Sequence, residues 1–127
     1  MAFKLGKSSS RKPIASEGSI TTPHIYRDKL DDGILGEAYD DGSIAVDESV
    51  KPGSEKEKEV VAHEMDHIKR MEDGQLAYGV NYVKWKDGFH QRKDGKIKYK
   101  GEWYNEGDEN LPWEELAFNA GNEVKNS

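Results

Sequence analysis

Residues 54–71 read SEKEKEVVAHEMDHIKRM, and they contain a helix start signal, a helical periodicity and two of the four histidines of the chain. Ser54 and Glu57 fit a capping box, in which a hydroxyl and a carboxylate each satisfy a free backbone N–H group at the start of a helix. Positions of one helix face then recur at helical spacing, namely Val60, Val61, Glu64, Ile68 and Met71. The pattern predicts a helix over residues 55–71, which an Asp-Gly pair then ends.

Two histidines, His63 and His67, stand four residues apart in the predicted helix. They differ by about 40° in rotation and about 6 Å in height, so both can reach one ion from the same side. Glu64 is turned by roughly 100° from His63, beside the open position of that ion, where it can take a proton from a metal-bound water. This is the His-Glu-x-x-His pattern of zinc sites. The alternative is that both histidines are polar residues on a helix face and that Glu64 is a solvated charge.

Upstream of this helix, the sequence predicts a β-hairpin. Residues 34–39 and 43–47 form two short segments on either side of an Asp-Asp-Gly turn. Residues 1–23 are rich in Ser, Lys and Gly, which is typical of a flexible arm or of an arm that a partner orders. We therefore expect an arm over residues 1–23 and one folded domain over residues 24–127.

Downstream of the helix, the sequence predicts a small β-meander over residues 79–104, in which two Lys-Asp-Gly tripeptides form turns. A short helix is expected from Pro112, because Pro favours a helix start, acidic residues follow it, and Gly121 stands near the expected end. These elements predict an α+β fold. We expect the three tryptophans to form much of the core, namely Trp85, Trp103 and Trp113.

Composition narrows the possible functions. The 127 residues are 34% hydrophobic, which allows one domain with a small core. The net charge of -6 disfavours nucleic acid as the principal partner. The chain has no cysteine, so a metal site must use His, Asp or Glu. There is no apolar run of the ~18 residues that cross a membrane, and no apolar segment typical of a secretory signal.

The His63 motif resembles the active-site helix of the zincin metallopeptidases, and residues 114–117, Glu-Glu-Leu-Ala, resemble the Glu-x-x-Ala of the second helix in the gluzincin branch. The resemblance covers about residues 33–121 and includes the predicted hairpin, which is similar to the strand that lines the substrate cleft. It implies a minimal, single-domain zincin-like fold with Zn2+ as the cofactor. It also implies the site residues, namely Glu64 as the catalytic general base and His63, His67 and Glu114 as metal ligands.

The third ligand and the role of Asp66 each have alternatives. Glu114 is favoured because it stands three residues before Ala117, but Glu115 and His90 compete with it. The alternative role for Glu114 is to stabilise the N-terminus of its helix. Asp66 can orient a histidine as a partner outside the ligand shell, or it can form a surface ion pair with Arg70. Spacing does not choose an oxyanion donor among Tyr78, Tyr82, Tyr104 and His90.

The resemblance leads to two function hypotheses. In the first, the chain is a zinc-dependent peptidase, a hydrolase that cleaves a peptide or protein substrate with a metal-activated water and with Glu64 as base. Such chains resemble stand-alone gluzincin-like domains of bacteria and their phages. In the second, the chain is a zincin-like structural or interaction protein of a phage virion or another assembly. A partner in that assembly would order the N-terminal arm. Both hypotheses place the chain in the cytoplasm or in a virion, with no membrane partner.

Overall fold

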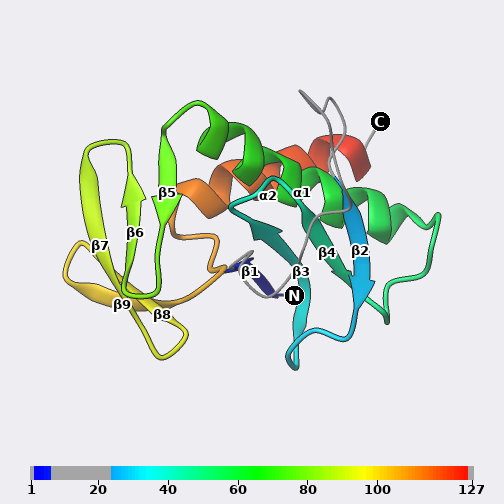
Figure 1. The fold of residues 1–127 in the computed structure, drawn as a ribbon, viewed down its shortest axis with the longest axis horizontal. Coiled ribbons are helices and arrows are strands. Elements are labelled where there is room, and N and C mark those ends of the chain that lie inside the picture. The colour runs from blue at the N-terminus through cyan, green and yellow to red at the C-terminus, as the bar shows by residue number, and fades with distance from the viewer. Residues whose placement is uncertain (1, 7–23, 126–127) are drawn as a thin grey trace.

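The computed structural model describes residues 2–6 and 24–125, whose strands and helices form an α+β fold, as predicted (Figure 1). The elements are, in chain order, β1 (Ala2–Gly6), β2 (Ile25–Asp28), β3 (Ile34–Tyr39), β4 (Ile44–Asp47), α1 (Glu55–Glu72), β5 (Leu76–Tyr78), β6 (Tyr82–Trp85), β7 (Gly88–Lys93), β8 (Lys96–Tyr99), β9 (Glu102–Asn105) and α2 (Pro112–Lys125).

The first sheet has four strands in the order β1-β3-β4-β2. Its centre is the predicted hairpin, because β3 and β4 are antiparallel neighbours, while β1 runs parallel to β3 and β2 runs parallel to β4. Strand β1 corrects the expectation of an arm over residues 1–23, because its residues form part of this sheet. Phe3 and Leu5 alternate with other residues and are both 1% exposed, so the sheet gains two core side chains from this segment. The rest of the expected arm, residue 1 and residues 7–23, lies outside the described residues.

Helix α1 confirms the predicted helix. The Ser54 hydroxyl accepts a hydrogen bond from the Glu57 backbone N–H at 3.2 Å, as a capping box requires. The Glu57 carboxylate accepts from the N–H of Gly53 at 3.0 Å, one residue earlier than the motif predicts. The helix contacts β3 and β4 on one side and packs along α2.

The predicted meander is confirmed and is longer than expected, with five antiparallel strands in the order β5-β6-β7-β8-β9. The two Lys-Asp-Gly tripeptides occupy different positions in their turns. In the first, Gly88 already belongs to β7 and Lys86 has a positive φ of 56°. In the second, Asp94 and Gly95 both have positive φ, as a two-residue hairpin turn requires. The same tripeptide therefore serves two turn geometries.

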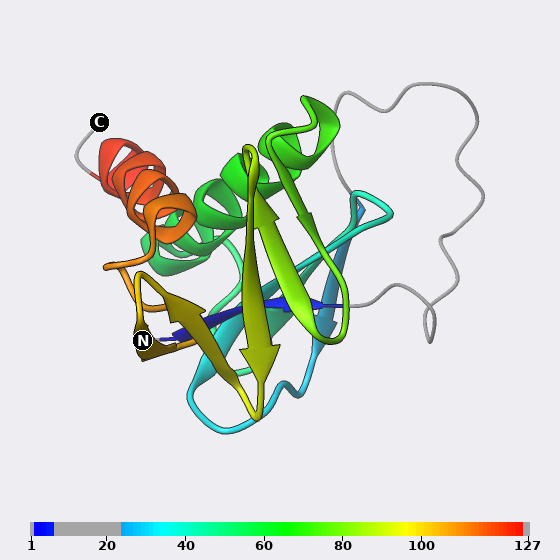
Figure 2. The ribbon, with the colours of Figure 1, turned by 90° about the vertical axis from the view of Figure 1, so that its left-hand side faces the viewer.

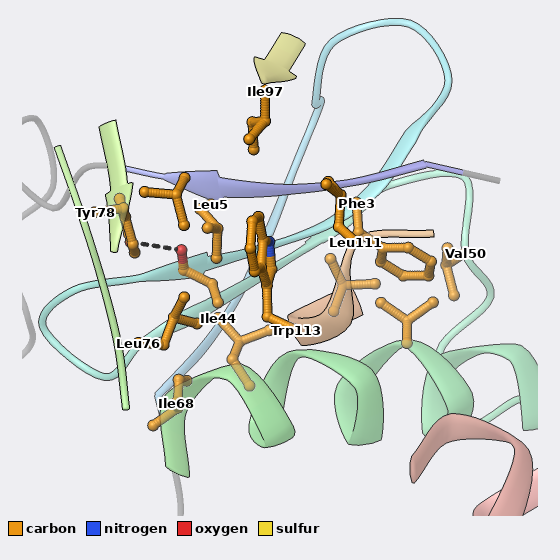
Figure 3. Packing of buried hydrophobic residues seen from close by; sticks show 14 residues of the cluster. Phe3, Leu5, Ile44, Val50, Ile68, Leu76, Tyr78, Ile97, Leu111 and Trp113 are labelled. Atoms are coloured by element: carbon orange, nitrogen blue, oxygen red, sulfur yellow. Dashed lines mark hydrogen bonds between the residues drawn. The ribbon is translucent and has the colours of Figure 1, made fainter. Parts of the chain in front are cut away.

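The core lies where the two sheets and the helices meet (Figure 3). The Trp113 ring, at the start of α2, is 0% exposed and lies among side chains from both sheets. The Tyr78 hydroxyl donates a hydrogen bond to the Ala38 carbonyl at 3.0 Å and so links the meander to the first sheet. Trp113 is thus the core tryptophan, whereas Trp85 is half-buried and Trp103 is 44% exposed, which corrects the expectation for Trp103.

Helix α2 is longer than predicted, since it continues through Gly121 to Lys125. Gly121 does not end the helix. It lies at the contact between α2 and α1. A Cβ atom at this position would lie 3.1 Å from the Glu59 carbonyl oxygen, so the missing side chain permits a close approach of the two helices. Neither helix of the described chain has the length and hydrophobicity needed to span a membrane.

Candidate metal centre

Three of the predicted site residues meet between the two helices. His63 and His67 project from α1, and Glu114 projects from the first turn of α2. Both Nε2 atoms face the same Glu114 oxygen, Oε1, at 2.9 Å for His63 and 3.0 Å for His67. One ligand atom from each of the three residues lies within 4.8 Å of the others, so the group can hold a metal ion.

Small residues on α2 allow Glu114 to reach the histidines. Ala117 and Gly121 stand three and seven residues after Glu114, so all three lie on one face of the helix. Ala117 is 0% exposed, and a Cβ at Gly121 would crowd the backbone of Glu59 in α1. This contact face keeps α2 close along α1, as the ribbon shows (Figure 1).

The donor set fits a zinc ion. Two imidazole nitrogens and one carboxylate oxygen form a common three-ligand zinc set that leaves a fourth position open. His63, His67 and Glu114 are each at most 1% exposed, and Glu114 Oε2 has no hydrogen-bond partner among the described residues. Buried ionisable groups are costly unless they are paired or bind a cation, so a cation would stabilise this cluster.

Electrostatics favour a charged carboxylate between two imidazoles. Burial raises the pKa of the Glu114 carboxyl, but the attraction of His67 and hydrogen bonds from both histidines lower that pKa to about 2. Burial also lowers the pKa of His63, and the adjacent Glu114 only partly opposes this shift. A neutral imidazole and an ionised carboxylate are the forms that bind a metal ion.

Glu64, the predicted general base, lies beside this group and is 0% exposed. Its two carboxylate oxygens have no hydrogen-bond partner among the described residues. Burial, followed by the charges of Glu114 and Glu37, raises the pKa of Glu64 well above its usual range. Gly36 of β3 makes room for it, because a Cβ there would lie 2.7 Å from Glu64 Oε2.

Strand β1 covers the site. The ring of Phe3 stacks on the ring of His63, with centroids 3.7 Å apart and planes 13° apart. Phe118 meets the same imidazole edge-on at 4.6 Å. The edge of β3 is not free to pair with another chain, because β3 lies between β4 and β1, and β1 occupies the edge of the sheet. The site is enclosed on this side by the chain's own N-terminal strand.

The structure distinguishes the alternatives for the neighbouring residues. Glu115 is exposed, and His90 lies on the meander with its ring 5.7 Å from that of Trp113. Neither residue belongs to the group of three side chains that could hold a metal ion. Asp66 accepts a hydrogen bond from Arg70 Nε at 3.0 Å, which is the ion pair that its spacing allows. The histidine Nδ1 atoms have no partner within the described ranges.

The four candidate oxyanion donors have other contacts. Tyr78 bonds to Ala38, Tyr82 packs against Phe89 at 5.8 Å between ring centroids, and the Tyr104 hydroxyl donates to Glu102 at 3.4 Å. His90 packs between Tyr99 and Trp113. These contacts do not assign an oxyanion donor.

Sequence reasoning missed two residues that shape the site, Phe3 and Gly36. Each had a weak signal. Phe3 and Leu5 alternate with polar or small residues, as in a strand, but the pattern is too short to predict a strand beside the polar segment that follows. Gly36 interrupts the apolar run of a predicted strand, and an isolated glycine there often marks a close backbone approach.

Comparison of the chain with protein-family models, with curated proteins and with solved structures finds no match.

Proposed function

We propose that this chain is a zinc-dependent peptidase in which His63, His67 and Glu114 hold the ion and Glu64 moves the proton. The observation that carries the proposal is the convergence of two Nε2 atoms on one Glu114 oxygen beside a second buried carboxylate. A bound zinc ion would supply Lewis-acid polarisation and a water of lowered pKa.

The contribution of the chain's own residues follows from their environments. Glu64 is fully buried, and its raised pKa favours uptake of a proton on a carboxylate oxygen. The protonated carboxyl is the form that can return this proton to the leaving amine. Gly36 lets Glu64 lie against β3, and the packing of α2 orients Glu114 toward both histidines.

Substrate access requires a movement in this proposal. The four side chains of the site are at most 1% exposed, so a peptide cannot reach them in the described conformation. Strand β1 is the element to move, because it lies at a sheet edge and its Phe3 ring covers His63. A moved β1 would leave the β3 edge free to pair with an extended peptide.

The test is a comparison of Glu64→Gln with the wild-type chain, using zinc-loaded protein and fluorescently quenched casein. We expect the variant to keep its zinc and to lose at least about 100-fold in turnover, because Gln keeps the shape of Glu but not its basicity. Asp66→Asn is the matched control, since it neutralises a carboxylate of the same helix that bonds to Arg70 instead. Equal turnover of Glu64→Gln and wild type would contradict the proposed base.

The enclosure of the site also favours a second candidate, a metal ion that only stabilises the fold of an interaction protein. In that case zinc raises the melting temperature, and casein stays intact both in the wild type and in Phe3→Ala, which opens the cover over His63. A peptidase predicts the opposite for Phe3→Ala, namely faster cleavage and faster loss of zinc to a chelator.

A further inference from the structure

The outer face of the meander differs in character from the rest of the molecule. Val83 and Ile97 point into the core and are 0% exposed, so alternate positions on the same strands point outward. Figure 2 shows the meander in front of the other described elements. The outward positions with aromatic or basic side chains are Tyr82, Lys84, Phe89, Lys93, Lys96, Lys98 and Trp103, which together we call the outer meander face.

This face carries positive charge in an acidic chain. Residues 76–105 contain seven Lys and Arg and three Asp and Glu, a net charge of +4, although the whole chain carries -6. Four of the lysines lie on the outer meander face, where the strands contribute no carboxylate. The three acidic residues are Asp87 and Asp94, which lie in turns, and Glu102, which begins β9. Glu102 alternates with Trp103 along β9, so it lies on the opposite face of the sheet. A local positive field can attract an anionic partner whatever the net charge of the molecule.

Aromatic rings stand on the same face. Phe89 is 69% exposed, Trp103 is 44% exposed and Tyr82 is 39% exposed. The rings of Tyr82 and Phe89 lie 5.8 Å apart and form one apolar platform, over which Lys84 Nζ lies 5.8 Å from the Phe89 centroid. A group of large exposed aromatic rings within a short segment usually indicates an interaction surface.

The second platform lies farther along the sheet. Trp103 stands on β9, directly opposite Lys98 of β8. Strand β9 is two strands from β7, which carries Phe89, so the platforms are separated by about 10 Å across the sheet. That distance is too great for one planar ligand to stack on both, but two groups of a single chain can each occupy one platform.

We propose that the outer meander face binds single-stranded nucleic acid, with bases stacked on Phe89 and Trp103 and phosphates paired with the lysines. A strand of unpaired nucleotides has flat bases that can stack on the aromatic rings and a regular series of negative charges that can pair with the lysines. An acidic peptide would use the lysines and leave the rings without a partner. A duplex keeps its bases stacked inside, where surface rings do not reach them.

The experiment is fluorescence anisotropy with the full zinc-loaded chain and fluorescein-labelled dT20 and U20, at 50 and at 300 mM NaCl as chosen conditions. We expect binding at low salt that weakens by at least about tenfold at high salt, since lysines release counterions from phosphates. Trp103→Ala and Phe89→Ala should each weaken binding about tenfold, and Lys98→Glu by a similar factor.

Matched controls lie elsewhere on the surface. Lys58→Glu makes the same charge change on α1, and Ile25→Ala removes an exposed apolar side chain from β2, so each should change affinity less than twofold. The absence of binding at low salt would overturn the proposal, as would equal affinity for a duplex of the same length. Equal affinity for a poly-glutamate peptide would identify an acidic protein as the partner instead, and binding unaffected by Trp103→Ala would show that no base stacks on this ring. Either result would overturn the proposal too.

Discussion

In the region between α1 and α2, ionisable side chains are buried and aromatic rings cover them, whereas in the meander lysines and aromatic rings stand side by side in solvent. His63 and Glu64 are at most 1% exposed, and Phe3 lies over the first of them. Phe89, at the other extreme, is 69% exposed. Charged residues usually lie outside and aromatic rings inside, so each region departs from the rule in its own way.

The contrast separates a candidate site for an ion from a candidate surface for a partner. A buried cluster of carboxylates and imidazoles destabilises a fold unless a cation offsets the cost, and this cluster could hold a metal ion. Exposed rings beside lysines add little to folding, so their presence points to a partner outside the chain. The two regions share the Trp113 core, yet each can be altered without removing the other's functional groups.

The largest effect is expected for His63→Ala. The wild type should bind about one zinc ion per chain, and at zinc about 1,000-fold above Kd this adds about 4 kcal/mol to the free energy of unfolding. His63→Ala should bind almost none, measured by metal analysis after gel filtration. The control is His90→Ala in the meander, which should keep its zinc because His90 does not belong to the metal group. Loss of zinc from His90→Ala alone would show that the site is misassigned.

The next effect separates two neighbouring carboxylates. Glu114→Gln should lower the melting temperature much more in zinc than after chelation, because Gln keeps an oxygen that can face both histidines but loses the charge that binds the ion. Glu115→Gln changes an exposed residue of the same helical turn and should behave like wild type in both conditions. A similar small loss for Glu114→Gln with and without chelator would indicate a helix-cap role.

The sequence predicts the metal-site region better than its surroundings, for a physical reason. His63, Glu64 and His67 lie within five residues of one helix, so their relative positions follow from helix geometry alone. Glu114 comes from a second helix, and only the resemblance to gluzincins indicated it before the structure placed it beside the histidines.

The features that sequence reasoning missed depend on contacts between distant segments. Strand β1 pairs with β3, about 30 residues away, and a short alternation of apolar residues does not name that partner. Trp103 was expected inside, but the phase of a strand decides which face a residue takes. In β9 it is Tyr104, paired with Ile97, that points inward. From the sequence, Gly121 predicts the end of a helix, because its contact with α1 depends on the tertiary structure.

Two tryptophans test the contrast between the regions directly. Trp113→Ala removes a fully buried ring and should lower the free energy of unfolding by about 3–5 kcal/mol. Trp103→Ala removes a ring from the outer meander face and should change the free energy by no more than about 0.5 kcal/mol. Urea unfolding followed by circular dichroism measures both. A loss of several kcal/mol for Trp103→Ala would mean that this ring supports the fold.

The smallest expected effect concerns the contact that sets the distance between the helices. Gly121→Ala gains about 1 kcal/mol of helix propensity, but its methyl group would lie 3.1 Å from the Glu59 carbonyl oxygen and 3.2 Å from the Glu59 Cγ. That backbone oxygen belongs to α1 and cannot move alone, so we expect an overpacking cost of about 1–3 kcal/mol to exceed the gain. The net loss in stability should be about 1 kcal/mol.

The Gly121→Ala substitution should also weaken zinc binding. If the methyl group pushes α2 away from α1, Glu114 on the same face moves away from His63 and His67, and zinc affinity should fall by several-fold. Ala120→Gly is the matched control, because it changes a neighbouring half-buried position of the same helix and loses propensity without crowding α1. It should lower stability by a similar amount and leave zinc affinity unchanged. Equal zinc affinity in Gly121→Ala and wild type, measured by competition with a chelating dye, would mean that the helix spacing at this contact does not position Glu114.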